Sequence, residues 1–171
     1  MLIYYSNYLL AKNFNPGQPE KLAISGQRVL LHTMGFGLVN FVFALPAFFL
    51  IDVVGRRSLL LSTFPLLAVS HVIMALSKNA GDHREAMFLV GYYLFGLFYS
   101  PGEGPVPFVY ASESMPLSIR DTGMGLVTSI NWLLNWLVAF SAPYLFRYLD
   151  MGGTFGLYAG FCVLLWLLIL L

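Results

Sequence analysis

Hydrophobic residues dominate this chain of 171 residues: 58% are hydrophobic and only 10% are charged, with a mean hydropathy of +0.76. A soluble domain averages about 25% charged residues because its surface faces water. The composition therefore excludes a soluble protein and predicts an all-α integral membrane protein in contact with the lipid bilayer. A net charge of +1 without a basic run excludes nucleic acid as a partner. Each span needs about 20 apolar residues, so the chain and its loops hold six spans at most.

Apolar runs between charged positions predict a single multi-pass membrane domain over 1–171. The first run has only about ten residues, half the length that crosses a hydrocarbon core. The last run ends at Leu171 without a polar cap. We therefore expect the first helix to be truncated and the chain to be a fragment. The predicted elements are a partial helix over 2–11 and spans over 27–51, 58–77, 86–112 (broken near 101–107), 122–147 and 153–171.

An acidic residue lies deep within the span predicted over 86–112. Glu103 precedes Glu113 by about ten residues, which is about 15 Å of helix from the polar end. Prolines at 101, 105 and 107 interrupt the helix around it, because proline lacks a backbone donor. An ionisable group at this depth, in an interrupted helix, is typical of a transporter's substrate site. The alternative is a proline kink for packing, in which Glu103 bonds free backbone donors.

Three asparagines lie at similar depth in two other spans. Asn40 is in the span over 27–51, and Asn131 and Asn135 are four residues apart, on one face of the span over 122–147. Trp132 and Trp136 repeat that spacing one position along. Amides that bind hydroxyl groups and rings that cover sugar C–H faces suit a polyhydroxyl ligand. The alternative is that each asparagine only joins neighbouring helices, a role worth about 0.6–2 kcal/mol.

Charged residues gather in two loops on one side of the membrane. The loop at 52–57 pairs a carboxylate with two arginines, and the loop at 113–120 carries a further acid and base. Arginine can bind a carboxylate through two parallel hydrogen bonds, so such pairs could hold helix ends together. Solvated anchoring at the membrane surface is the alternative. The residues of this predicted network are Asp52, Arg56, Arg57, Glu113 and Arg120.

Catalytic motifs are absent from the sequence. It contains no HExxH, GxSxG or P-loop pattern, and its three histidines do not have the spacing of a metal site. The single cysteine, Cys162, cannot form a disulfide within the chain. We predict no enzyme activity, no cofactor and no metal.

Four segments together resemble the sugar porters of the major facilitator superfamily, and the resemblance covers essentially the whole chain. It implies the C-terminal six-helix bundle of a twelve-helix major facilitator fold. Tyr4-Tyr5-Ser6 is similar to the end of the seventh helix, and Asp52-x-x-Gly-Arg-Arg57 is similar to the loop between the eighth and ninth helices. Gly104-Pro-Val-Pro107, followed by Glu113, Pro116 and Arg120, is similar to the tenth helix and its cytoplasmic exit. Asn131-Trp132-x-x-Asn135 is similar to the eleventh helix.

The resemblance implies roles for the residues singled out above. Asn40, Asn131 and Asn135 would contact a sugar, and Phe108 would stack on the sugar or gate it. Glu103 joins this predicted substrate site because of its depth in the interrupted helix and not because of the resemblance. The charged network would lie on the cytoplasmic side and gate the transporter. Phe108 stands where many glucose transporters have tryptophan, and Ser100 stands where they have glutamate. This variant is closer to fungal members, so we expect a sugar or polyol rather than a hexose specifically.

The expected function is therefore that of a fragment of a sugar or polyol transporter that works by alternating access. Alternating access rocks two six-helix halves around a site at the midplane, so we expect the chain to be inactive without an N-terminal half as its partner. We expect it in the plasma membrane. The alternative is a non-transporting membrane protein fragment that associates with an intact transporter or regulates it.

Overall fold

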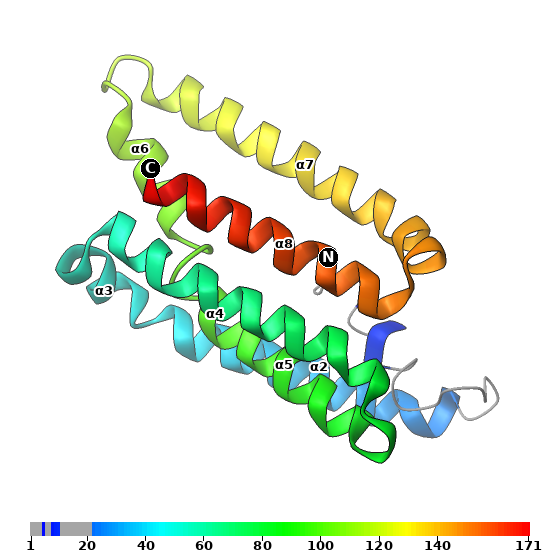
Figure 1. Cartoon of the computed structure of the whole chain (residues 1–171). Helices are drawn as coiled ribbons and strands as arrows, with labels where there is room; N and C mark the ends of the chain where they lie inside the picture. The colour runs from blue at the N-terminus through cyan, green and yellow to red at the C-terminus, as the bar shows by residue number, and fades with distance from the viewer. Residues whose placement is uncertain (1–4, 6–7, 11–21) are drawn as a thin grey trace.

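The structure is a computed structural model that describes residue 5, residues 8–10 and residues 22–171. Every element in these residues is helical (Figure 1). Of the partial helix expected over 2–11, only Tyr5 and residues 8–10 lie within the described part. The elements are α2 (Leu22–Ala44), α3 (Ala47–Val54), α4 (Arg56–Leu76), short 3₁₀ turns at Ser77–Asn79 and Gly81–His83, α5 (Arg84–Tyr99), α6 (Val106–Ser114), α7 (Arg120–Tyr148) and α8 (Asp150–Leu170).

Three helical segments among the described residues are long and apolar enough to cross a membrane: Arg56–Asn79, α7 and α8. The pair Gln27–Ala44 and Ala47–Val54 forms a fourth if its two bent parts count as one span. The helix α5 has only 16 residues, because the span expected over 86–112 is divided between α5 and α6. The described helices therefore provide up to four spans by this measure, whereas the sequence predicted five full ones.

A bend divides the span that the sequence predicted as continuous over 27–51. The axes of the two parts meet at 42°, at the break that contains Leu45 and Pro46. Pro46 has no backbone N–H and its ring crowds the preceding turn, which is the ordinary cause of a sharp helix bend. By contrast, Pro65 and Pro143 lie inside α4 and α7 without ending either helix.

The helix α4 is at the centre of the packing and contacts α8, α5 and α3. Figure 1 shows α8 between α7 on one side and the layer of α2, α4 and α5 on the other. The helix α7 contacts α8 and α6, and none of the residues in its most hydrophobic window is buried. The larger apolar cluster among the described residues consists of Leu9, Leu10, Val29, Phe36, Met74, Phe88, Tyr92, Ala142, Phe146, Met151 and Phe155.

A glycine allows α5 to approach α4 very closely. A Cβ atom at Gly91 would lie 2.9 Å from the carbonyl oxygen of Ser70 and 2.7 Å from Cγ of Met74. Both neighbours belong to α4, and the carbonyl is part of its backbone. The α4–α5 interface therefore has no room for a side chain at position 91. This interface fixes how the end of α5 meets α4, and the candidate site lies at that junction.

Candidate functional site

The segment between α5 and α6, residues 100–105, is a sequence of turns that we call the break segment. Its prolines interrupt the helical hydrogen bonding, as the sequence predicted. Some backbone bonds remain, from Gly104 N–H to the Tyr99 carbonyl at 3.1 Å and from Val106 N–H to the Gly102 carbonyl at 3.2 Å. A Cβ atom at Gly102 would overlap the side chain of Thr63 on α4. The break segment is thus pressed against the middle of α4.

Glu103 lies in this break segment with its carboxyl group against α4. Its Oε1 atom is 3.0 Å from Oγ1 of Thr63, a residue that is only 5% exposed. Its Oε2 atom is buried and has no hydrogen-bond partner among the described residues. No arginine, lysine or histidine of the described chain forms an ion pair with this carboxyl group. The acidic side chain predicted at depth is therefore held by a neutral hydroxyl and not by a counter-charge.

Asn40 connects α2 to the start of the same break segment. Its Oδ1 atom is 2.8 Å from the hydroxyl oxygen of Ser100. The Ser100 hydroxyl is also 2.6 Å from the carbonyl oxygen of Gly96. Ser100 is 2% exposed and Asn40 is half-buried. The structure thus joins two positions that the sequence analysis considered separately, and it ties α2 to α5.

Asn131 and Asn135 lie on the more covered side of α7. They share a stripe of residues with the buried Ala142 and Phe146, as helical spacing requires. In the described part of the chain, neither amide has a hydrogen-bond partner. Both amides therefore remain available to a ligand.

The two tryptophans of this segment face another direction. Trp132 and Trp136 are each 61% exposed. The Trp136 ring stacks on Phe140, with ring centroids 5.5 Å apart, and Phe140 lies 5.8 Å from Tyr144. This aromatic ladder runs along the exposed side of α7. The sequence analysis combined the indoles with the amides, but the structure puts them on different faces because each residue advances about 100° around a helix.

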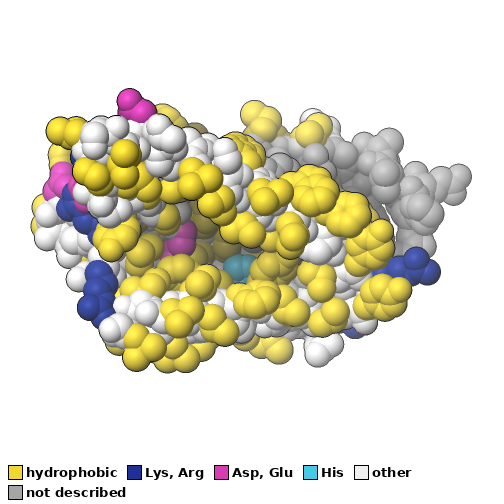
Figure 2. Space-filling view, turned by 90° about the horizontal axis from the view of Figure 1, so that it is seen from above, with side chains coloured by type: hydrophobic (Ala, Val, Ile, Leu, Met, Phe, Trp, Pro, Cys, Tyr) yellow, Lys and Arg dark blue, Asp and Glu magenta, His cyan; other side chains and the backbone are white. Residues whose placement is uncertain are grey.

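Figure 2 shows a face on which an acidic side chain and a histidine lie in a hollow between two ridges of hydrophobic side chains. On the same view, positively charged side chains gather near the two ends of the molecule. Phe108 is in the first turn of α6, directly after the break segment, and is 37% exposed. This distribution, with charges at the ends and an apolar girdle between them, is that of a protein surrounded by lipid.

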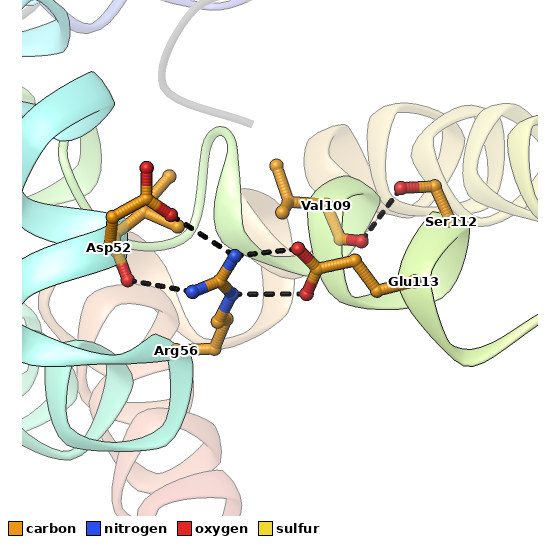
Figure 3. A network of polar contacts seen from close by, with 6 residues as sticks. Asp52, Arg56, Val109, Ser112 and Glu113 are labelled. Carbon is orange, nitrogen blue, oxygen red and sulfur yellow. Dashed lines mark hydrogen bonds and ion pairs between the residues drawn. The ribbon is translucent and has the colours of Figure 1, made fainter.

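Arg56 is the centre of the charged network (Figure 3). Its Nε atom donates to Oε2 of Glu113 at 3.0 Å, and its Nη2 atom donates to Oε1 at 2.6 Å. Nη2 is also 3.2 Å from Oδ1 of Asp52, and Nη1 donates to the carbonyl of Ile51 at 3.1 Å. Gly55, with a φ of +86°, makes the tight turn between α3 and α4. One guanidinium thus joins the ends of α3, α4 and α6.

Arg57 and Arg120 take no part in that cluster. Arg57 donates to the carbonyls of Ile169 at 3.0 Å and Leu170 at 2.7 Å, where the last turn of α8 has free acceptors. Arg120 donates to the carbonyl of Met115 at 3.3 Å. Of the five residues grouped by the sequence, three therefore meet and two bind backbone carbonyls. Arg56 and Arg57 also border a cavity of about 400 Å³ with Leu60, Val106, Pro107, Tyr110 and Ile169.

Sequence reasoning missed the side chain that holds Glu103. Thr63 belongs to the span predicted over 58–77, in which the sequence analysis singled out no residue, and it lies forty positions before Glu103. Hydroxyls in membrane helices usually bond the carbonyl one turn back, so the residue type alone is not informative. The contact between Thr63 and Glu103 follows from the packing of α4 against the break segment at Gly102, which the sequence alone does not show.

Replacing Arg56 should loosen the ends of three helices together. We expect Arg56→Ala and Glu113→Ala each to lower the midpoint of thermal unfolding in detergent by a few degrees. We expect the unfolding midpoint of the double variant to fall by less than the sum of the two single decreases, because both changes remove the same bidentate pair. Arg57→Ala is the matched control, since Arg57 binds only carbonyls of α8 and should add to Glu113→Ala without coupling. Equal coupling energies for Arg56 and Arg57 would contradict the network.

Comparison with known proteins gives the class to which this helical membrane chain belongs. The model of the family described as "Sugar (and other) transporter" matches residues 1–171. The chain therefore belongs to this family of sugar porters in the major facilitator superfamily, which confirms the resemblance seen in the sequence. This is a family of transport proteins and not of enzymes.

Several proteins that are named as transporters are similar to the chain. It is 35% identical over 150 residues to "Probable polyol transporter 3" of Arabidopsis thaliana, covering 84% of this chain and 29% of the relative. It is 32% identical over 135 residues to "Myo-inositol transporter 2" of Schizosaccharomyces pombe, covering 74% of this chain and 24% of the relative. It is 33% identical over 143 residues to "Myo-inositol transporter 1" of Cryptococcus neoformans, covering 75% of this chain and 25% of the relative. The chain thus spans less than a third of the length of these curated relatives.

Proposed function

We propose that this chain is the C-terminal six-helix half of a sugar or polyol transporter and forms one wall of its substrate path. The break segment is the observation that carries the proposal, since it puts Glu103 and the Asn40–Ser100 pair in the middle of otherwise helical spans. Interrupted helices at this depth line a substrate path in secondary transporters. The relatives named above as polyol and myo-inositol transporters support a small polyhydroxyl solute as the substrate.

Each candidate residue has a defined task in this proposal. Asn40, Asn131 and Asn135 bind hydroxyl groups of the solute, and Phe108 covers an apolar face of the ring. Glu103 belongs to the same wall. The charged cluster of Asp52, Arg56 and Glu113 holds the cytoplasmic ends of three helices together in one state of an alternating-access cycle. The protein that contains this half acts in the plasma membrane.

One half alone has no second wall against which to rock. We therefore expect that vesicles containing only this chain take up labelled myo-inositol no faster than empty vesicles. Co-reconstitution with the N-terminal six-helix half of a related inositol transporter should restore uptake. Vesicles with that N-terminal half alone are the control.

The outcomes of this reconstitution are distinct. Uptake by the chain alone would overturn the proposal that it supplies only one wall. Failure of the combined halves, together with co-purification of this chain with an intact transporter, would instead favour a non-transporting fragment that associates with one. A purified combination that neither transports nor binds any polyol would refute the assignment of the site.

A further inference from the structure

The hydroxyl of Thr63 faces more acceptors than it has hydrogens. Its Oγ1 atom is 2.9 Å from the carbonyl oxygen of Leu59, 3.3 Å from that of Leu60 and 3.0 Å from Oε1 of Glu103. A threonine hydroxyl donates only one hydrogen, and an ionised glutamate can only accept. The carbonyl of Leu59 lies within α4 and already accepts from the backbone N–H of Thr63, so the Thr63 hydroxyl can either donate to an ionised Glu103 or accept from a protonated one.

Among the described residues, no positively charged side chain pairs with Glu103. Thr63 on α4 is almost fully buried, and Oε2 of Glu103 is buried without a partner. The other titratable side chains that interact electrostatically with this carboxyl are the Tyr99 phenol on α5 and the Cys162 thiol on α8, and neither supplies a positive charge. The backbone N–H of Glu103 itself is near the carboxyl, but it does not bond Oε2. A charged carboxylate buried without a counter-ion costs several kcal/mol.

We propose that Glu103 is a proton-binding site, with its carboxyl group neutral in this conformation and donating from Oε1 to Oγ1 of Thr63. Thr63 then donates its own hydrogen to the carbonyl of Leu59, and each hydrogen has one acceptor. When the proton leaves, the O–H bond breaks, its electron pair stays on the carboxylate and the proton passes to water. The carboxylate that remains is more stable in water than in its buried place, so loss of the proton weakens the hold of the break segment on α4.

This inference deepens the proposed function, because the break segment is part of the proposed substrate path. Proton occupancy of Glu103 would decide whether α5 and α6 are held against α4. The structural part of the inference does not depend on transport, since it concerns the protonation state of one side chain in this chain alone.

Infrared difference spectroscopy of the whole chain in lipid vesicles at neutral pH tests the proposal. The difference between the wild type and Glu103→Gln should contain the carbonyl stretch of a protonated carboxylic acid. Glu113→Gln is the matched control: Glu113 is paired with Arg56, so its difference spectrum should contain only carboxylate bands. Loss of carboxylate bands alone in Glu103→Gln would overturn the proposal.

A second variant protects this test against a folding defect. Glu103→Gln should keep the wild-type helical content and unfolding midpoint, because its amide can donate to Thr63 as the neutral acid does. In Thr63→Val the acid band should persist but shift, since the O–H group loses its acceptor. If Thr63 instead donates to an ionised Glu103, this variant changes only carboxylate bands and the proposal fails. None of these spectra depends on uptake. A missing acid band would therefore refute the proton site without refuting the transport proposal, and a lack of uptake would refute the transport proposal without refuting the proton site.

Discussion

Replacing Asn135 with alanine should raise the polyol concentration that gives half-maximal uptake by about 2- to 10-fold. A hydrogen bond contributes about 0.5–1.5 kcal/mol, and about 1.4 kcal/mol corresponds to tenfold in affinity. The Asn135 amide lies on the covered side of α7 and has no partner among the described residues, so it is free to bind a hydroxyl group. The measurement is uptake of labelled myo-inositol by the two co-reconstituted halves, at equal amounts of protein.

Asn131 should behave in the same way, since it is one helical turn away on the same face. The double variant Asn131→Ala with Asn135→Ala should raise the half-saturating concentration by about 10-fold or more, although two bonds to one solute are not strictly additive. If the asparagines only hold helices together, the double variant should lower the unfolding midpoint and leave the half-saturating concentration unchanged.

Ser129→Ala is the matched control on the same helix. Ser129 is exposed and its hydroxyl already donates to the carbonyl of Gly125, so its loss should change neither uptake nor affinity. Trp136→Leu is a second control. The Trp136 ring belongs to the exposed aromatic ladder and not to the amide face, so we expect its removal to leave the half-saturating concentration unchanged. A large effect of Trp136→Leu would mean that the exposed side of α7 also lines the substrate path.

The sequence predicted the break segment but not the bend at Pro46. Three prolines within seven residues remove three backbone donors from one short stretch, and their rings crowd the preceding turns. The helix α5 therefore ends before them, at Tyr99. A single proline does not determine whether a helix continues or bends. Pro65 and Pro143 lie within continuous helices, whereas Pro46 coincides with a 42° bend. Packing against neighbouring helices decides between these results, and no local pattern contains that information.

Partners of the candidate site residues depend on rotation around helix axes. Arg56 and Arg57 are adjacent and identical, but they differ by about 100° around α4. One therefore reaches Glu113 on α6, and the other reaches the end of α8. For the same reason, Trp132 faces away from Asn131. Residue types and spacing thus identified the groups with chemistry, while their partners, above all Thr63 for Glu103, required the packed bundle.

Gly91→Ala should be the most destabilising single change at the α4–α5 interface. The added methyl group would lie 2.9 Å from the Ser70 carbonyl oxygen, and a backbone atom cannot move aside as a side chain end can. Overpacking of this kind costs about 1–3 kcal/mol, which for a chain of this size lowers the unfolding midpoint by about 2–4 °C per kcal/mol. Thermal unfolding in detergent, followed by circular dichroism, measures the effect.

Gly156→Ala is the matched control, because a Cβ atom there would have no neighbour within 4 Å. Alanine is the better helix former, so Gly156→Ala should be as stable as the wild type or more so. Equal midpoints for the two variants would contradict the close packing of α5 on α4.

A functional consequence follows from the same geometry. The helix α4 carries Thr63 and α5 leads into the break segment, so separating these helices at Gly91 should also weaken the contact between Thr63 and Glu103. The acid band assigned to Glu103 should then shift in Gly91→Ala and stay in place in Gly156→Ala.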